Sequence, residues 1–197
     1  MEITWLGGNA LLLKGRDTRV LLDPAFKAGD SPPGGAELVV SAAAEENRFQ
    51  PDQGPQVVAR PGEYELSGVS VRAVATARAT LFVTEVDEVA VLDLGTFRGP
   101  LEMEALDAIG ALDVLAVSVG EGAPGRAVEV AALASQLQPA VLVPMDYQAA
   151  PEGVPGELAD FVKEMGLTQS NSQAKLNLAG SAGPSDDTRV VILEARR

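Results

Sequence analysis

The spacing of apolar residues changes near residue 100, and this change limits the possible folds more than any other feature of the sequence. Before that point, short runs of strand-forming residues are separated by Gly, Pro, Asn and Asp, which is typical of consecutive short strands. The runs cover residues 3–6, 10–13, 18–22, 37–41, 56–59, 69–75, 80–85 and 89–92. Their close spacing predicts a mostly antiparallel sheet in this part of the chain.

After residue 100, segments with helical spacing of apolar residues alternate with apolar strands. Helices are predicted at residues 101–109, 127–137 and 158–165, and strands at 113–119, 141–144, 175–178 and 189–194. Strands first, followed by alternating helices and strands, predict an α/β fold in which helices cover two packed sheets. No segment has the composition of a linker, so we expect one domain spanning residues 1–197.

The charge of the chain narrows the classes of partner. The formal net charge is -13 and no run of Lys or Arg interrupts it, so nucleic acids and anionic membrane surfaces are not expected partners. The N-terminal residues show no basic segment followed by a long apolar stretch, so we expect a cytoplasmic protein. A small molecule or another protein remains as the expected partner, and the chain could form a homo-oligomer.

The sequence contains no histidine and no cysteine. Histidine is the commonest general base and the commonest zinc ligand, and cysteine supplies thiolate ligands and nucleophiles. Ser-His-Asp catalysis, Cys catalysis and disulfides are therefore excluded.

A glycine-rich turn offers one candidate site. Gly120, Gly122 and Gly125 match the G-x-G-x-x-G spacing of dinucleotide-binding turns, between a predicted strand and a predicted helix. An acidic residue, Asp146, follows the next strand. Too few residues follow for a complete dinucleotide-binding domain, so an ordinary glycine-rich turn is the simpler interpretation, with nucleotide binding as an alternative.

Six further segments together resemble one known family. The run at residues 5–13 is followed by V-L-L-D-P at 20–24, and R-P-G-E-Y-E-L-S-G-V follows at 60–69. Later come D-L-G-T-F at 93–97, D-V-L at 113–115 and the P-M-D-Y end of residues 139–147. In this order, they resemble the metallo-β-lactamase superfamily, and more narrowly its compact bacterial branch of lactonase-like, Zn-dependent hydrolases.

The resemblance implies an αββα four-layer sandwich with a zinc site at one edge, but the residues at the ligand positions differ from those of the family. The family signature H-x-H-x-D-H aligns with the segment after Ser41, and four more metal-site positions lie elsewhere in the chain. The corresponding residues are Gly8, Ala42, Ala44, Glu46, Asn47, Arg78, Thr96 and Asp146. Methyl groups cannot coordinate a metal and an arginine repels one, so we expect no zinc cofactor. For Asp23, which follows the third predicted strand, we expect a structural role in closing a turn.

Two interpretations of function follow. The first is a catalytically degenerate homologue without catalytic residues, which binds a small ligand or a protein. The second is a hydrolase that holds Mg²⁺ or Mn²⁺ through Glu46, Asn47 and Asp146, with Asp93 close by, because hard cations accept oxygen ligands. If the site is degenerate, we expect these side chains to splay apart, or Arg78 to pair with Asp146 or Glu46.

Overall fold

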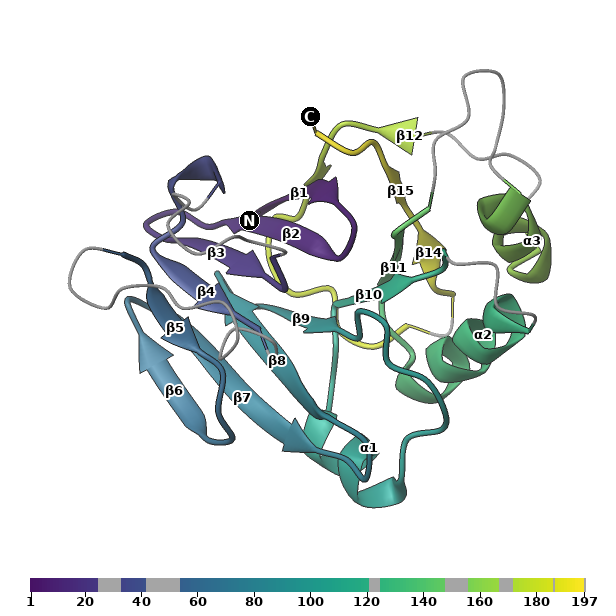
Figure 1. Cartoon of the computed structure of the whole chain (residues 1–197), viewed down its shortest axis with the longest axis horizontal. Helices are drawn as coiled ribbons and strands as arrows, with labels where there is room; N and C mark the ends of the chain where they lie inside the picture. Colours follow the sequence, from purple (N-terminus) through teal and green to yellow (C-terminus); the bar gives the residue numbers. More distant parts are fainter. Residues whose placement is uncertain are drawn as a thin grey trace.

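The computed structural model describes residues 1–24, 33–41, 54–120, 125–147, 156–166, 172–185 and 187–196. In this part of the chain, two large β-sheets pack face to face, with helices outside them (Figure 1). A short two-stranded sheet pairs β12 (Ser172–Gln173) with β15 (Ile192–Leu193). The α/β fold with two packed sheets that the sequence predicts is thus confirmed.

The first sheet has six strands among the described residues, in the order β13-β1-β2-β3-β4-β5. They are β13 (Leu176–Asn177), β1 (Glu2–Gly7), β2 (Ala10–Lys14), β3 (Arg19–Leu22), β4 (Leu38–Val40) and β5 (Gln56–Val58). The strands β1, β2 and β3 pair antiparallel, whereas β3, β4 and β5 pair parallel. The sequence did not indicate these parallel pairings.

The middle strands of this sheet are apolar on both faces. In β2, Leu11 and Leu13 face the core between the two sheets. Leu12 instead belongs to a second cluster on the outer face, with Leu21 and Val39. A 3₁₀ helix (Pro33–Gly35) covers this cluster, and its Gly34 lies so close to Leu12 that a Cβ atom there would come within 2.5 Å of the leucine side chain. Burial on both faces explains why these strands read as continuous apolar runs.

The second sheet has seven strands in the described residues, in the order β14-β11-β10-β9-β8-β7-β6. They are β14 (Arg189–Val190), β11 (Val141–Met145), β10 (Val114–Ser118), β9 (Val89–Asp93), β8 (Thr80–Val86), β7 (Val69–Ala75) and β6 (Glu63–Leu66). The strands from β6 to β9 pair antiparallel, and those from β9 to β14 pair parallel. The change occurs at β9, where the sequence changes from hairpins to alternating helices and strands.

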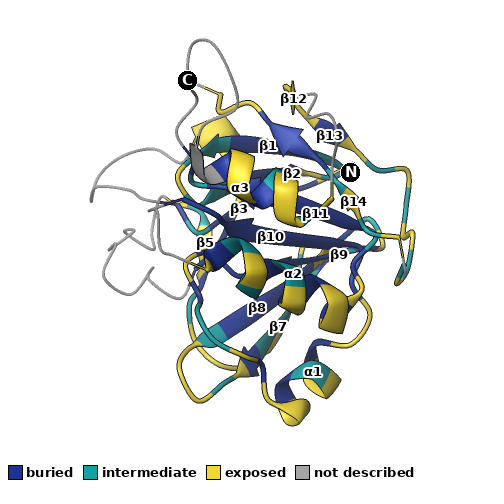
Figure 2. Cartoon of the chain, turned by 90° about the vertical axis from the view of Figure 1, so that its right-hand side faces the viewer, coloured by how far each residue is buried: buried dark blue, intermediate teal, exposed yellow. Residues whose placement is uncertain are grey.

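Three α-helices in the described ranges lie outside the second sheet: α1 (Met103–Ile109), α2 (Arg126–Leu137) and α3 (Gly156–Glu164). Figure 2 shows α2 and α3 in front of the parallel strands of that sheet, with exposed residues on their outer faces. Gly110 ends α1 with a φ of 66° and Gly166 follows α3 with a φ of 68°, as their place after the predicted helices indicated. No helix among the described residues is long and apolar enough to cross a membrane.

Candidate functional site

A cavity of about 440 Å³ opens where the carboxyl ends of several strands meet. The ends of β3 and β4 line the cavity from the first sheet, and the end of β9, with β8 and the turn before it, lines it from the second sheet. Ligand sites in α/β proteins commonly lie beyond the carboxyl ends of parallel strands, where backbone ends and loop side chains converge. The lining residues are Leu22, Asp23, Val40, Ser41, Arg78, Ala79, Thr80, Leu81, Phe82, Thr84, Asp93, Leu94, Gly95, Thr96, Phe97 and Arg98.

Two aspartates form the acidic end of this cavity. Asp93 is the last residue of β9, and its Oδ1 accepts a hydrogen bond of 2.8 Å from the Gly95 N–H. Asp23 follows β3, and its Oδ1 accepts a hydrogen bond of 2.6 Å from the Ser41 hydroxyl. Burial and the nearby charge of Asp23 raise the pKa of Asp93 to about 8, although the hydrogen bond from Gly95 opposes this shift. Asp93 therefore holds its proton at neutral pH.

Two residues that line the cavity each carry a buried polar atom that has no hydrogen-bond partner in the described part of the chain. One of these atoms is Asp93 Oδ2, and the other is the hydroxyl oxygen of Thr84, whose side chain is fully buried at 0% exposure. A buried polar atom without a partner costs about 1–3 kcal/mol, so such atoms are rare in native proteins outside functional sites. Both atoms belong to residues that line the cavity, so a ligand with hydrogen-bonding groups could satisfy them there.

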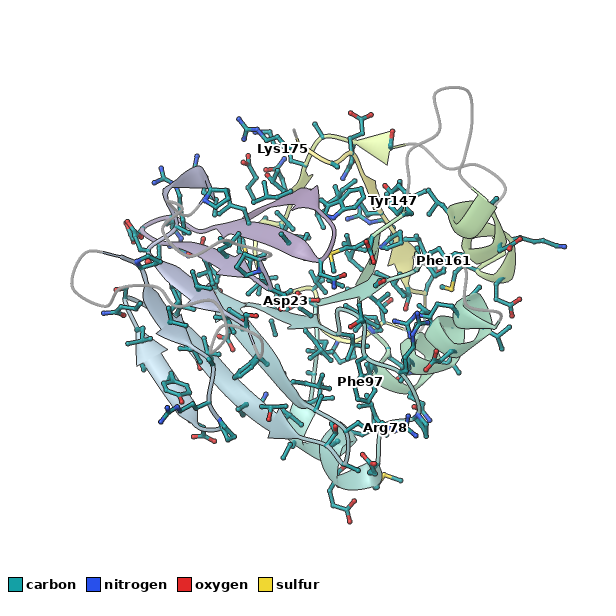
Figure 3. All side chains as sticks on the ribbon, in the orientation of Figure 1. Asp23, Arg78, Phe97, Tyr147, Phe161 and Lys175 are labelled. Atoms are coloured by element: carbon teal, nitrogen blue, oxygen red, sulfur yellow. The ribbon has the colours of Figure 1, made fainter. Side chains whose placement is uncertain are left out.

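The opposite end of the cavity is basic. Arg78 lies in the turn before β8 and donates a hydrogen bond of 3.4 Å to the carbonyl oxygen of Arg98. Arg98 in turn forms an ion pair of 3.8 Å with Glu129. Figure 3 shows Asp23 and Arg78 at opposite ends of a line of labelled side chains, with Phe97 between them. The cavity thus presents acidic, aromatic and basic side chains in that order.

The first turn of α2 holds the loop that forms one side of the cavity. The Arg126 side chain is buried, and it donates hydrogen bonds of 2.8 Å to the Ser118 carbonyl and 2.9 Å to the Phe97 carbonyl. Its guanidinium also pairs with Glu129, which accepts a hydrogen bond from the Gly99 N–H. These contacts fix residues 95–99 against the helix, so the cavity wall depends on a residue that does not line it.

Replacing Arg126 with methionine should therefore loosen this wall. We expect the variant to lose about 2 kcal/mol of unfolding free energy, because methionine fills the space of the arginine stem but leaves the two carbonyl groups without their donor. Urea unfolding measures the loss. Arg189→Met changes an exposed arginine on β14 and should cost less than about 0.5 kcal/mol. Equal stability of the two variants would show that Arg126 does not hold the loop.

Comparisons with known proteins bear on the family. A β-lactamase superfamily domain matches residues 2–146. Among solved structures, a metallo-β-lactamase-superfamily protein from Thermotoga maritima is 24% identical, with 98% of each chain covered and a TM-score of 0.73. No curated protein matches in the corresponding sequence comparison. The chain belongs to the metallo-β-lactamase superfamily.

Two other similar structures are enzymes of this fold. The metallo hydrolase Igni18 from Ignicoccus hospitalis is 16% identical, with 90% of this chain and 98% of that chain covered and a TM-score of 0.58. Isothiocyanate hydrolase from Delia radicum gut bacteria is 12% identical, with 100% and 98% covered and a TM-score of 0.58. At these identities the likeness shows the shared fold and leaves activity open.

The superfamily implies a zinc site, and the residues of this metallo-β-lactamase-fold chain do not fit one. The whole sequence offers no imidazole or thiolate ligand. Within the described ranges, no three acidic side chains come together in a group that could hold a metal ion. We therefore derive no chemical step through zinc.

The structure places some of the sequence-predicted site positions together and leaves others apart. Arg78, Asp93 and Thr96 line the cavity. Asp146 follows β11 and accepts a hydrogen bond of 3.1 Å from the Ser118 hydroxyl, and it is not among the lining residues. Arg78 does not pair with Asp146, which was one of the alternatives that we expected, and its pairing with Glu46 lies outside the described residues. Gly8 lies in the turn after β1, where its carbonyl accepts a hydrogen bond from the Trp5 side chain. Ala42, Ala44, Glu46 and Asn47 lie outside the described residues.

Sequence reasoning missed two of the most informative cavity residues. We expected Asp23 only to close a turn, but its carboxylate lines the cavity and lies close enough to Asp93 to shift that group's pKa. Thr84 lies inside an apolar strand, where a threonine ordinarily indicates nothing but strand propensity. The available signal for Asp23 was its place directly after an apolar strand, which Asp93 shares.

Proposed function

We propose that this metallo-β-lactamase-fold protein binds a small molecule in the cavity between β3, β4, β8 and β9, and that it does not act as a zinc hydrolase. The observation that carries the proposal is the pair of buried, unpaired polar atoms, Asp93 Oδ2 and Thr84 Oγ1, on the wall of a 440 Å³ cavity. A volume of this size is typical of small-molecule sites. A protein partner would need an extended surface, whereas the two residues that carry these atoms line a concave one.

The residues at the expected metal positions support the second half of the proposal. A catalytic zinc site needs three protein ligands and an open position for water. Ala42 and Ala44 stand where the resemblance places two histidines, and neither side chain has a donor atom. The alternative, a hard cation held by Glu46, Asn47 and Asp146, would have only oxygen ligands. One of these residues, Asp146, already accepts a hydrogen bond from the Ser118 hydroxyl.

The test is metal content together with hydrolysis. Untagged protein is incubated with Zn²⁺, Mn²⁺, Mg²⁺ and Ca²⁺, free metal is removed, and bound metal is counted by native mass spectrometry. We expect no stoichiometric metal, and no cleavage of nitrocefin, bis(p-nitrophenyl) phosphate or γ-dodecalactone above the rate in buffer. Retained Mn²⁺ or Mg²⁺ that is lost in Asp146→Ala, together with cleavage of any of these substrates, would overturn the proposal in favour of the carboxylate-bound metal hydrolase.

A further inference from the structure

We propose that the ligand of this cavity is a small zwitterion of amino-acid or dipeptide size, with its ammonium group at Asp23 and Asp93 and its carboxylate at Arg78 and Arg98. This inference rests on the proposed function and narrows it to one chemical class. It uses the order of charges along the cavity together with the unpaired buried atoms at its acidic end.

The acidic end suits an ammonium group. An ammonium group has three donors and one positive charge, so it can serve two carboxylates and a hydroxyl at once. Thr84 Oγ1 is an acceptor without a partner, Asp93 Oδ2 becomes one when Asp93 releases its proton, and Asp23 keeps one carboxylate oxygen beyond its hydrogen bond with Ser41. The positive charge would also favour the ionised form of Asp93, which burial and the charge of Asp23 disfavour. An ammonium group would therefore give the acidic end the positive charge and the hydrogen-bond donors that it lacks.

The basic end suits a carboxylate. Arg78 donates only to a backbone carbonyl at 3.4 Å, and no carboxylate pairs with it among the described residues. The Arg98 ion pair with Glu129 is long, at 3.8 Å. A planar carboxylate can accept two parallel hydrogen bonds from a guanidinium, which gives short, charge-assisted contacts.

The wall between the two ends is apolar. Phe82 and Phe97 both line it, and Figure 3 shows Phe97 between Asp23 and Arg78. A cation without a carboxylate would leave the arginines unused. An anion without an amine would meet two aspartates on a protein of net charge -13. A molecule with both charges and a short apolar body matches all three parts of the wall.

The test is a matched binding series. The twenty common L-amino acids and their glycyl dipeptides are screened by thermal shift near pH 6.5, where the amines of the amino acids, dipeptides and methyl esters are mostly protonated and a bound ammonium charge favours the ionised form of Asp93. We expect at least one compound to raise the melting temperature by about 2 °C or more at about 10 mM. Calorimetry then compares that compound with its methyl ester, which keeps only the cation, and its N-acetyl derivative, which keeps only the anion. Each derivative should bind at least about tenfold more weakly.

Two variants assign the ends of the ligand. Arg78→Gln should remove most of the preference for the zwitterion over its methyl ester while leaving affinity for the ester unchanged. Asp23→Asn, which retains an acceptor for Ser41, should weaken the zwitterion about tenfold. The matched controls are Arg189→Gln and Asp107→Asn at exposed positions, and neither should change binding.

The outcomes separate this inference from the proposed function. If the ester binds as tightly as the parent compound, the cavity is a cation site, so the zwitterion inference is wrong while small-molecule binding stands. If the N-acetyl form binds equally, or if no compound in the series binds, the inference is also wrong. The metal and hydrolysis measurements decide, independently of this series, the second half of the proposed function, that the protein does not act as a metal-dependent hydrolase.

Discussion

Replacing Gly120 with alanine should destabilise the protein by at least about 3 kcal/mol, because a Cβ atom at this position has no room. It would lie 1.5 Å from the carbonyl oxygen of Asp146 and 2.7 Å from its carbonyl carbon. Both are backbone atoms, which cannot rotate away as the end of a side chain can. The Val119 N–H also donates a hydrogen bond of 2.9 Å to the Met145 carbonyl, so the two chain segments cannot separate without losing it.

Denaturant unfolding of Gly120→Ala against wild type measures this cost. Gly180→Ala is the matched control, because no atom lies within 4 Å of a Cβ placed there. It should change stability by less than about 0.5 kcal/mol. If Gly120→Ala were as stable as Gly180→Ala, the close approach of Gly120 to Asp146 would not exist in solution.

This contact also explains one motif of the sequence. Gly120 opens the G-x-G-x-x-G turn, whose spacing suggested a nucleotide as an alternative ligand. The structure gives this glycine a packing reason that needs no phosphate, and Gly125 has a conformational one, since it precedes α2 with a φ of 84°. Residues 121–124 lie outside the described residues. A glycine spacing in a sequence cannot distinguish close backbone packing from a phosphate cradle, because both require the absence of a Cβ atom.

The fold was largely predictable, because its elements depend on local pattern. The predicted helix at residues 127–137 is α2 (Arg126–Leu137), and the apolar run at 113–119 is β10 (Val114–Ser118). Periodicity and turn residues fix such elements within a few residues. The parallel pairing of β3 with β4 and β5 was not predictable in this way. Pairing joins segments far apart in the chain, and a strand buried on both faces does not show in its sequence which neighbour it has.

The candidate site was only partly predictable, for the same physical reason. The resemblance indicated Arg78, Asp93 and Thr96, and the structure brings all three to one cavity. It also indicated Asp146, which does not line that cavity. Neither the pairing of Asp23 with Asp93 nor the unpaired hydroxyl of Thr84 follows from composition, because each depends on how two sheets pack. Such convergence is a tertiary property, and one sequence carries no direct signal for it.

Asp93→Asn should make the protein more stable above neutral pH. The pKa of Asp93 is raised from its ordinary 3.8 to about 8, so between these values the folded protein holds a proton that the unfolded chain has released. Protonated Asp93 therefore makes its full contribution to the free energy of unfolding below about pH 4, and this contribution is lost as the pH rises toward 8. If Asp93 lay in a dry interior, a pKa shift of this size would lower the free energy of unfolding by more than about 5 kcal/mol. The Asp93 side chain lines the cavity and is only partly buried, so we expect Asp93→Asn to gain about 3 kcal/mol near pH 8 and almost nothing near pH 4.

Urea unfolding of wild type and Asp93→Asn at several pH values between 4 and 9 measures this gain. The difference in unfolding free energy should grow with pH, whereas the exposed control Asp107→Asn should show a difference that stays near zero. A constant difference for Asp93→Asn would mean that Asp93 ionises normally and that the cavity wall is fully hydrated.

A carboxyl group whose ionisation lowers the stability of the folded protein needs a compensating role, and such costs concentrate at functional sites. A bound ammonium group would supply the compensation, because its charge stabilises the ionised carboxylate. Saturating zwitterion should therefore raise the stability of wild type more at pH 8 than it raises that of Asp93→Asn.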